Sequence, residues 1–176
     1  VPGGEGAVAA TVNLTTTHPR RAGHLAVHRC DQPAPDTSVH NFTRSQIVAH
    51  AALAPLDANG DFCVTTLTQT NLIVDVTGVL WPDDGFTAID PTRWWDTRKQ
   101  GGGAKVAAGG TLALDLDDLP ASAGVNGSPA ALALVVTAAE GAGLGHVTVS
   151  GCDPDADHSN VNFVGGSATP NLVFVA

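Results

Sequence analysis

The sequence predicts an all-β protein built from two pseudo-repeated β-sandwich, jelly-roll-like units. Short runs rich in Val, Leu, Thr and Phe are separated by Gly, Pro, Asn and Asp, which is typical of strands joined by turns. Glycine occurs 20 times and proline 11 times in the 176 residues, as expected for many short strands. The strongest observation is an internal repeat, which keeps its register for about fifty residues.

The internal repeat is clearest around two of the cysteines. Residues Gly23–Cys30 read GHLAVHRC and residues Gly145–Cys152 read GHVTVSGC, so Gly, His, Val and Cys coincide without a gap. The segment before this match aligns as well, ATVNLT with LALVVT. After the match and a one-residue deletion, SVHNF aligns with SNVNF, and VAHAALA aligns with TPNLVFV. We therefore expect a first unit over residues 1–82 and a second over residues 83–176, joined near the polar turn Trp81–Gly85.

Alternating apolar residues predict individual strands within the units. The stretch NLIVDVTG places Leu72, Val74 and Val76 on one face of a strand. The stretch TLALDLDDL, residues 111–119, is expected to form a strand with its leucines inward and its aspartates outward.

One hairpin is also expected. The stretch DANGDFCVTTL, residues 57–67, predicts a hairpin with Asn59 and Gly60 at its tight turn. The segment Ser45–Ala54 is the only one that competes as a helix, and it is short.

Composition and charge exclude several classes of function. The 17 acidic residues outnumber the 8 basic ones, and the formal net charge is -9. A protein that binds phosphate backbones or anionic membrane surfaces needs the opposite sign, so we expect no nucleic-acid and no membrane partner. No stretch approaches the roughly 18 apolar residues of a membrane span, which predicts a soluble chain. The start at Val1 without a Met favours a mature or trimmed chain.

The three cysteines predict one disulfide. Pairing Cys30 with Cys63 joins two strands of the first unit across about 33 residues and contributes about 3–4 kcal/mol in the loop-entropy model. This bond implies an oxidising compartment, and three reduced, buried cysteines are the alternative. Cys152 aligns with Cys30, but the residue matching Cys63 would lie beyond Ala176. We therefore expect Cys152 as a buried free thiol, or else as a sign that the last hairpin of the second unit is missing.

Several motifs resemble the repeat modules of secreted actinobacterial cell-wall and surface proteins. FTAIDPTRWWDTR, residues 86–98, with the Gly-rich stretch after it, resembles their P-x-R-(V/L)-(L/x)-DTR opening. VNLTTTHPRRAGHLAVHRC resembles their LNVT…GxxTVxxC segment, SVHNF and SNVNF resemble SNLNF, and FCVTTLTQTNLIVDVTG resembles the closing VCLYSSxxTxLVVDVxG. The resemblance covers most of the chain. It implies accessory β-sandwich modules, a secreted location and a non-catalytic role, without specifying a ligand.

The chain departs from the family pattern in the order of its parts. Val135 stands where the family has Asn, which Asn13 keeps, and only the second unit carries the DTR-type opening. Only the first unit carries the closing segment, so the chain is either cut from a longer array or a permuted pair. An incomplete sandwich leaves an open strand edge that invites a partner strand.

The predicted function is therefore a non-catalytic, secreted adaptor or structural module that assembles with another protein. Its partner is expected to be another secreted protein or a neighbouring module, held by strand exchange. The adaptor subunit of a secreted antibacterial toxin particle is one setting that fits.

The motif RWWDTR carries the best small-ligand candidate. Trp94 and Trp95 can stack on sugar rings, and Asp96 and Arg98 share a face if the motif is a strand. The alternative function is accordingly a carbohydrate- or cell-wall-binding module with a cell-wall glycan as partner. A structural role fits the same residues, with one Trp in the core and the Asp–Arg pair as a clasp.

No metal, cofactor or catalytic residue is predicted. His24, His28 and Cys30 on one strand face could ligate zinc, but a disulfide at Cys30 is favoured. The acidic stretches Asp57–Asp61 and Asp153–His158 lack the glutamate that ends a calcium loop, and a turn and a solvated loop explain them. GGSAT lacks the last Gly of G-x-S-x-G, and no phosphate loop or dinucleotide motif is present. A hydrolase is the least favoured interpretation.

Overall fold

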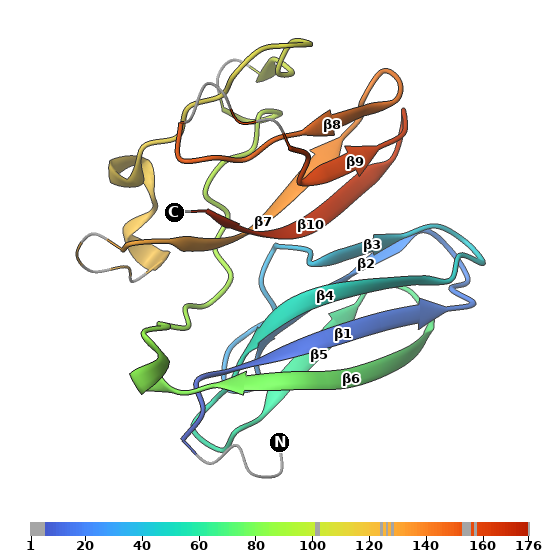
Figure 1. Cartoon of the computed structure of the whole chain (residues 1–176). Coiled ribbons are helices and arrows are strands. Elements are labelled where there is room, and N and C mark those ends of the chain that lie inside the picture. Colours follow the sequence, from blue (N-terminus) through green and yellow to red (C-terminus); the bar gives the residue numbers. More distant parts are fainter. Residues whose placement is uncertain are drawn as a thin grey trace.

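The protein is all-β, as the sequence predicts. The computed structural model describes residues 6–100, 103–123, 125, 127, 129–152, 156 and 158–175. Within these residues the helical turns are short 3-10 turns, among them η1 (Pro82–Asp84), η3 (Leu116–Asp118) and η4 (Ala121–Ala123), and all regular sheets are antiparallel. Strands β1 to β6 are called here the first strand group, and β7 to β10 the second strand group (Figure 1).

The first strand group forms two three-stranded sheets, in the orders β4-β1-β6 and β3-β2-β5. Both sheets contribute to one hydrophobic cluster, in which Val12 and Leu14 of β1 and Leu25 and Val27 of β2 are fully buried. Alternate residues of β1 face this cluster because side chains alternate along a strand. The strands are β1 (Ala9–Thr17), β2 (Gly23–Arg29), β3 (His40–Phe42), β4 (Val48–Pro55), β5 (Phe62–Thr66) and β6 (Asn71–Leu80).

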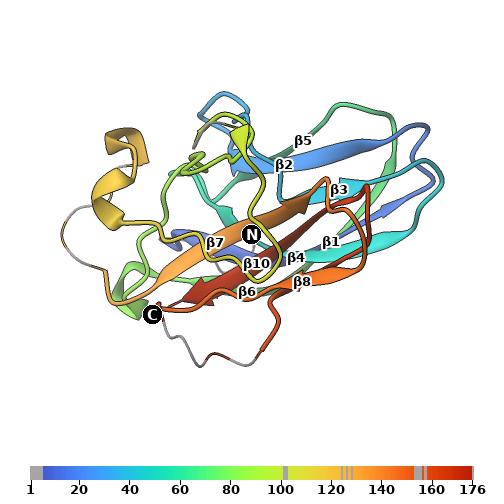
Figure 2. The ribbon, with the colours of Figure 1, turned by 90° about the horizontal axis from the view of Figure 1, so that it is seen from above.

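The second strand group has the same order of strands but fewer of them. It consists of β7 (Leu132–Ala139), β8 (Gly145–Val147), β9 (Val161–Phe163) and β10 (Ala168–Val175), paired as β10-β7 and β8-β9. Strand β10 lies against β3 and β4 of the first group, as the views from the side and from above show (Figures 1 and 2). The second group therefore contacts the first through β10, one of the two strands of its β10-β7 sheet.

The two groups pair their strands in equivalent register. Gly23 lies opposite Phe42 between β2 and β3, and Gly145 lies opposite Phe163 between β8 and β9. Ala10 lies opposite Ala54 between β1 and β4, and the aligned residues Leu132 and Val175 lie opposite each other between β7 and β10. The sequence alignment and the strand pairing thus agree position by position.

Two sequence predictions about elements are wrong. The segment over residues 57–67 is no hairpin: a tight turn forms at Asn59 and Gly60, but β4 before it and β5 after it belong to different sheets. Residues 111–115 form no strand, and the leucines expected inside are exposed at Leu112 and Leu116. The prediction that Leu72, Val74 and Val76 share one face of a strand is confirmed on β6, where all three side chains are exposed. The competing helix over residues 45–54 is excluded, since β4 occupies most of it.

Candidate functional site

The four predicted ligand residues lie in a loop and a turn, not on a strand. Residues 86–96 have no regular structure, and a turn begins at Thr97. Within that turn the Asp96 carboxylate accepts hydrogen bonds from Arg98 Nε at 2.9 Å, Arg98 Nη2 at 2.8 Å and the Arg98 backbone N–H at 3.1 Å. Asp96 and Arg98 do lie together, but they form a bidentate pair in which the carboxylate and the guanidinium hydrogen-bond each other.

The electrostatics of this pair follow from its geometry. Hydrogen bonding to the Arg98 guanidinium holds the pKa of Asp96 well below its usual range, and the same bond raises the pKa of Arg98. The Asp96 side chain is buried while the Arg98 side chain is more than half exposed. Next to the pair, Arg93 reaches the first strand group and donates to the Asp36 carbonyl at 2.8 Å. The motif therefore stabilises a turn through the Asp96–Arg98 pair and contacts the loop before β3 through the Arg93 hydrogen bond.

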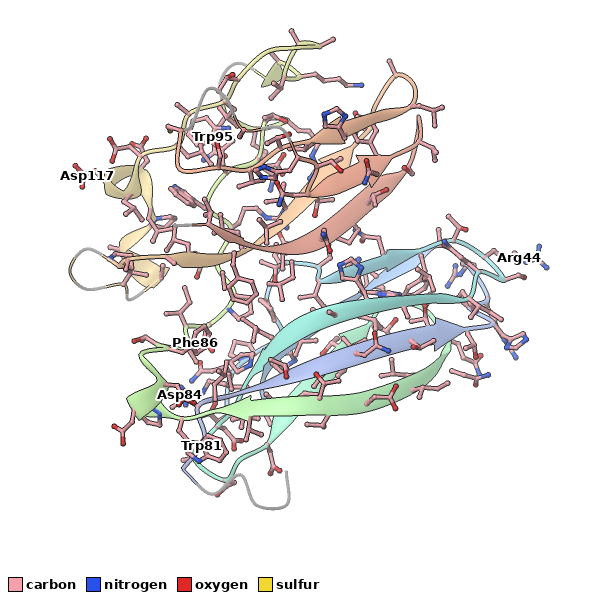
Figure 3. The ribbon with its side chains drawn as sticks, in the orientation of Figure 1. Arg44, Trp81, Asp84, Phe86, Trp95 and Asp117 are labelled. Atoms are coloured by element: carbon pink, nitrogen blue, oxygen red, sulfur yellow. A yellow bond between two sulfur atoms is a disulfide. The ribbon has the colours of Figure 1, made fainter. Side chains whose placement is uncertain are left out.

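The two tryptophans differ in their surroundings. The indole N–H of Trp94 is buried and has no hydrogen-bond partner. Trp95 lines a shallow, open cavity of about 300 Å³ together with Gln100 and Lys105. Figure 3 shows Trp95 beside the second strand group, far from Trp81, which lies beside the first. Of these two tryptophans, Trp95 is the one that lines this open cavity.

The metal hypotheses receive no support from the described residues. Cys30 is bonded to Cys63, so it is no thiolate ligand. Both ring nitrogens of His28 are engaged, one by the Arg29 carbonyl and one by the Thr65 hydroxyl. Among the residues whose positions the structure gives, no three His, Cys, Asp or Glu side chains are grouped to hold a metal ion.

The structure describes one of the two acidic stretches, Asp57–Asp61, in full and the other, Asp153–His158, only in part. Asp57 Oδ1 accepts hydrogen bonds from the backbone N–H groups of Asn59 at 2.9 Å and Asp61 at 3.0 Å, so it holds a turn. Most of the acidic loop Asp153–His158 lies outside the described residues.

A second candidate site is formed by two strand edges that lack a partner. In the first strand group, β1 pairs with both β4 and β6, and β2 pairs with both β3 and β5. In the second group, β7 pairs only with β10 and β8 only with β9 within the described chain. The edges of β7 and β8 that remain are those that β6 and β5 occupy in the first group. An unpaired edge presents backbone N–H and C=O groups that a further strand can bind.

Side chains next to the open edge of β7 are incompletely covered. Val12 and Leu14 of β1 are fully buried, whereas the aligned residues of β7, Leu134 and Val136, are only half-buried. Leu134 lies opposite the buried Val173, which shows that this face of β7 is the inner one. The described residues 103–113, which precede β7 in sequence, are exposed.

The third component of this site is Cys152. It is a free, exposed cysteine in the loop after β8, which ends at Val147, and in the sequence it aligns with Cys30, which is disulfide-bonded directly after β2. The sequence prediction of a buried thiol is wrong, because the strand that would cover this position is absent among the described residues. We call the edges of β7 and β8 together with Cys152 the open site.

Sequence reasoning pointed to the open site only in general terms. The mismatch between the two halves predicted an open strand edge, but it did not identify β7 and β8 as the strands concerned. The alignment of Cys152 with Cys30 was the available signal, since Cys30 is bonded to the strand that covers β2.

Comparison with known proteins adds no further assignment. No protein-family model, no curated protein and no solved structure matches this chain. Within the described residues, no helix has the length and apolar character needed to cross a membrane.

Proposed function

We propose that this chain is a non-catalytic, secreted adaptor that holds another protein by adding that protein's strand to the open site. The two strand groups are, in this proposal, copies of one β-sandwich unit, and the described residues form six strands in the first group and four in the second. Equivalent pairing registers in the two groups support the copy relationship. The Cys30–Cys63 disulfide agrees with an extracellular setting.

One observation carries the proposal: no strand among the described residues pairs with β7 in the way that β6 pairs with β1, and the inner side chains of β7 are half-buried. Covering such side chains removes apolar surface from water, at about 25 cal/mol per Å². New backbone hydrogen bonds along the edge would add affinity, while the pockets between side chains would select the partner. The same two contributions hold β6 on β1.

The test uses a strand donor of known fit. Residues 62–80, which contain β5 and β6, are called the closing segment; a synthetic peptide of residues 61–80 with Cys63→Ser serves as the probe. We expect the full chain to bind this peptide, with slower amide hydrogen exchange over Leu132–Ala139. The intact Cys30–Cys63 bond keeps the chain's own closing segment in place, so the probe reports on the open site.

A matched pair of variants locates the binding. Leu134→Lys places a charge on the inner face of β7 and should weaken peptide binding about tenfold or more. Val135→Lys places the same charge on the opposite face, where 41% of the side chain is already exposed, and should leave binding unchanged. Equal effects of the two variants, or no binding by the unsubstituted chain, would contradict the proposal.

A second candidate function is glycan binding at Trp95. The observation that favours it is the open cavity where Trp95 lies with Gln100 and Lys105, since an aromatic face with adjacent polar groups suits a sugar ring. Sedimentation with peptidoglycan and a glycan array test it, with Trp95→Ala against Trp81→Ala as control. Trp81 is also exposed but lies beside the other strand group (Figure 3).

A further inference from the structure

We propose that three loops at one end of the first strand group bind an acidic segment of another protein that also carries aliphatic side chains. The loops are residues 18–22 between β1 and β2, 43–47 between β3 and β4, and 67–70 between β5 and β6. We call them together the basic loop end. This surface is separate from the open site, so the inference goes beyond the proposed function and does not depend on strand addition.

The charge of the basic loop end is opposite in sign to that of the whole chain. It carries Arg20, Arg21 and Arg44, whereas all 17 acidic residues of the sequence lie outside these loops. The three arginines are exposed, and Figure 3 shows Arg44 extending away from the end of the strands. Within the described residues, the ion pairs join other side chains, and none involves these three arginines. Their guanidinium groups are therefore available to the carboxylates of a partner.

Backbone hydrogen bonds hold the three loops together. The N–H of Arg20 donates to the Gln69 carbonyl at 3.0 Å, and the N–H of Ser45 donates to the Pro19 carbonyl at 2.9 Å. Pro19 itself is fully buried, which anchors the loop that carries the two adjacent arginines. The arginines of two loops thus belong to one surface whose backbone is already ordered, and this order lowers the entropy lost on binding.

The joining of these strands does not require arginines. In the second strand group, the loops in the corresponding places are residues 140–144 between β7 and β8 and 164–167 between β9 and β10. They read EGAGL and VGGS and contain no basic residue. These loops also hydrogen-bond each other, since the N–H of Gly166 donates to the Gly141 carbonyl at 3.0 Å. The arginines of the first group are therefore better explained by a partner than by the fold.

Exposed aliphatic side chains in the same loops favour a protein segment over a polyanion. Ile47 is 66% exposed and Leu67 is 71% exposed. A phosphate polymer or a sulfated glycan neutralises arginine but has no apolar groups to cover these two side chains, whereas a protein segment supplies carboxylates and aliphatic groups together. The net charge of -9 also repels a long polyanion from the rest of the surface, which favours an acidic segment confined to the loops.

The basic loop end lies away from both ends of the described chain. Strand β1 begins at Ala9 and runs toward these loops over nine residues, about 30 Å at the usual rise of a strand. Strand β10 ends at Val175 toward the same end as Ala9 (Figure 1). The polypeptide next to either end is therefore not placed to cover these loops, and a separate protein is the occupant that the inference names.

An NMR titration of the full chain, labelled with ¹⁵N, tests the inference. The probe is the acetylated and amidated peptide ELDELDE. We expect amide shifts concentrated in residues 18–22, 43–47 and 67–70, and weaker binding when NaCl is raised from about 0.05 M to about 0.5 M, because salt screens exposed charges. The peptide ESDESDE, which has the same charge without leucine, should bind about threefold more weakly or less tightly still.

Matched variants locate the binding. Arg44→Glu should raise the dissociation constant of ELDELDE about tenfold or more, because it turns an attraction into a repulsion. Lys99→Glu makes the same change in net charge at another exposed residue and should have about a twofold effect or less. Leu67→Ser should weaken binding about threefold, whereas Leu112→Ser, at a leucine that is 42% exposed in another loop, should not. Arg44→Gln repeats the charge test if Arg44→Glu lowers the melting temperature.

Three outcomes would overturn the inference. The first is no shift at the basic loop end with ELDELDE at millimolar concentration. The second is an equal effect of Arg44→Glu and Lys99→Glu. The third is that inorganic polyphosphate of matched charge, or vesicles of phosphatidylserine and phosphatidylcholine, shift the same amides at lower concentration than the peptide, because the occupant would then be a polyanion or a lipid surface. None of these outcomes bears on the open site, which the peptide of residues 61–80 tests separately.

Discussion

Two histidines in the first strand group lie close together in a setting that disfavours their charged forms. His40 on β3 is 1% exposed, and its Nε2 lies 3.0 Å from the Thr16 hydroxyl. The ring of His50 on β4 lies edge-on to it, with the centroids 5.8 Å apart. Burial, with a smaller contribution from His50, lowers the pKa of His40 to about 4, and burial also lowers the pKa of His50. Both histidines are therefore neutral near pH 7.

We expect the free energy of unfolding to fall as the pH drops from about 6.5 to about 4. Across this window the unfolded His40, with its ordinary pKa of 6.5, binds a proton that the folded state excludes. The stability supplied by neutral His40 is thus present above pH 6.5 and is lost as the pH falls toward 4. The loss amounts to about 2–3 kcal/mol.

Urea unfolding at a series of pH values measures this effect. His40→Gln should flatten the dependence within the window, because the substituted side chain does not titrate. His146→Gln, which removes an exposed histidine from β8, is the control and should leave the profile unchanged. A wild-type profile that is flat between pH 6.5 and pH 4 would contradict the prediction.

The Asp96–Arg98 pair shows that residue identity and spacing can predict an ion pair without predicting its backbone geometry. The sequence raised the possibility of their pairing, since opposite charges two positions apart meet in a strand. The structure forms the pair in a turn, where the Arg98 fork and the Arg98 backbone N–H converge on one carboxylate. Spacing alone does not separate these two geometries, because both bring the side chains within reach.

At the scale of elements, a glycine facing a phenylalanine ring recurs in both strand groups. A Cβ added to Gly23 would lie 3.1 Å from the Phe42 ring, and one added to Gly145 would lie 2.6 Å from the Phe163 ring. Each pair lies directly opposite in its two-strand ladder. Because glycine has no Cβ, the phenylalanine ring can approach its backbone closely, which gives a physical reason for glycine at both positions.

Gly145→Ala should therefore destabilise the second strand group by about 1–3 kcal/mol, because the new methyl group overlaps the Phe163 ring. Thermal unfolding followed by circular dichroism measures the loss. Gly143→Ala is the matched control, since nothing lies within 4 Å of its added Cβ. The double variant Gly145→Ala, Phe163→Leu should recover part of the stability, and an unaltered melting temperature for Gly145→Ala would contradict the packing argument.

Strand prediction succeeded where an alternating segment finds a partner and failed where it does not. The segment Ser45–Ala54 competes as a short helix in the sequence, yet pairing with β1 makes residues 48–54 part of strand β4. Residues 111–115 alternate well, yet they are mostly exposed and pair with no described strand. Alternation shows that a segment can form a half-buried strand, whereas a neighbouring edge is required for it to do so.

At the scale of the whole molecule, the Cys30–Cys63 disulfide joins the middle and edge strands of one sheet across 33 residues. Replacing both cysteines with serine should lower the free energy of unfolding by about 3–4 kcal/mol, because the unfolded chain regains the entropy of an open loop. Guanidinium unfolding of the oxidised and doubly substituted chains measures this difference. Cys152→Ser should leave stability unchanged, since Cys152 is exposed and unbonded. A comparable loss for Cys152→Ser would refute this account.

At the contact between the two strand groups, β10 lies against β3 and β4, while no described strand pairs with the second edges of β7 and β8. The adaptor proposal places the partner strand at these edges, away from the β10 side of the sheet.

The sequence by itself determined the β class, the positions of most strands and the disulfide, and it predicted a repeat of two halves. These are consequences of local pattern: alternation has a period of two residues, turns need Gly, Pro, Asn or Asp, and a repeat preserves both. Only the tertiary structure decided which edges stay open, that β4 and β5 lie in separate sheets, and that RWWDTR ends in a turn. Those outcomes depend on contacts between residues far apart in the chain, and each strand edge is paired or exposed according to what the rest of the fold brings beside it.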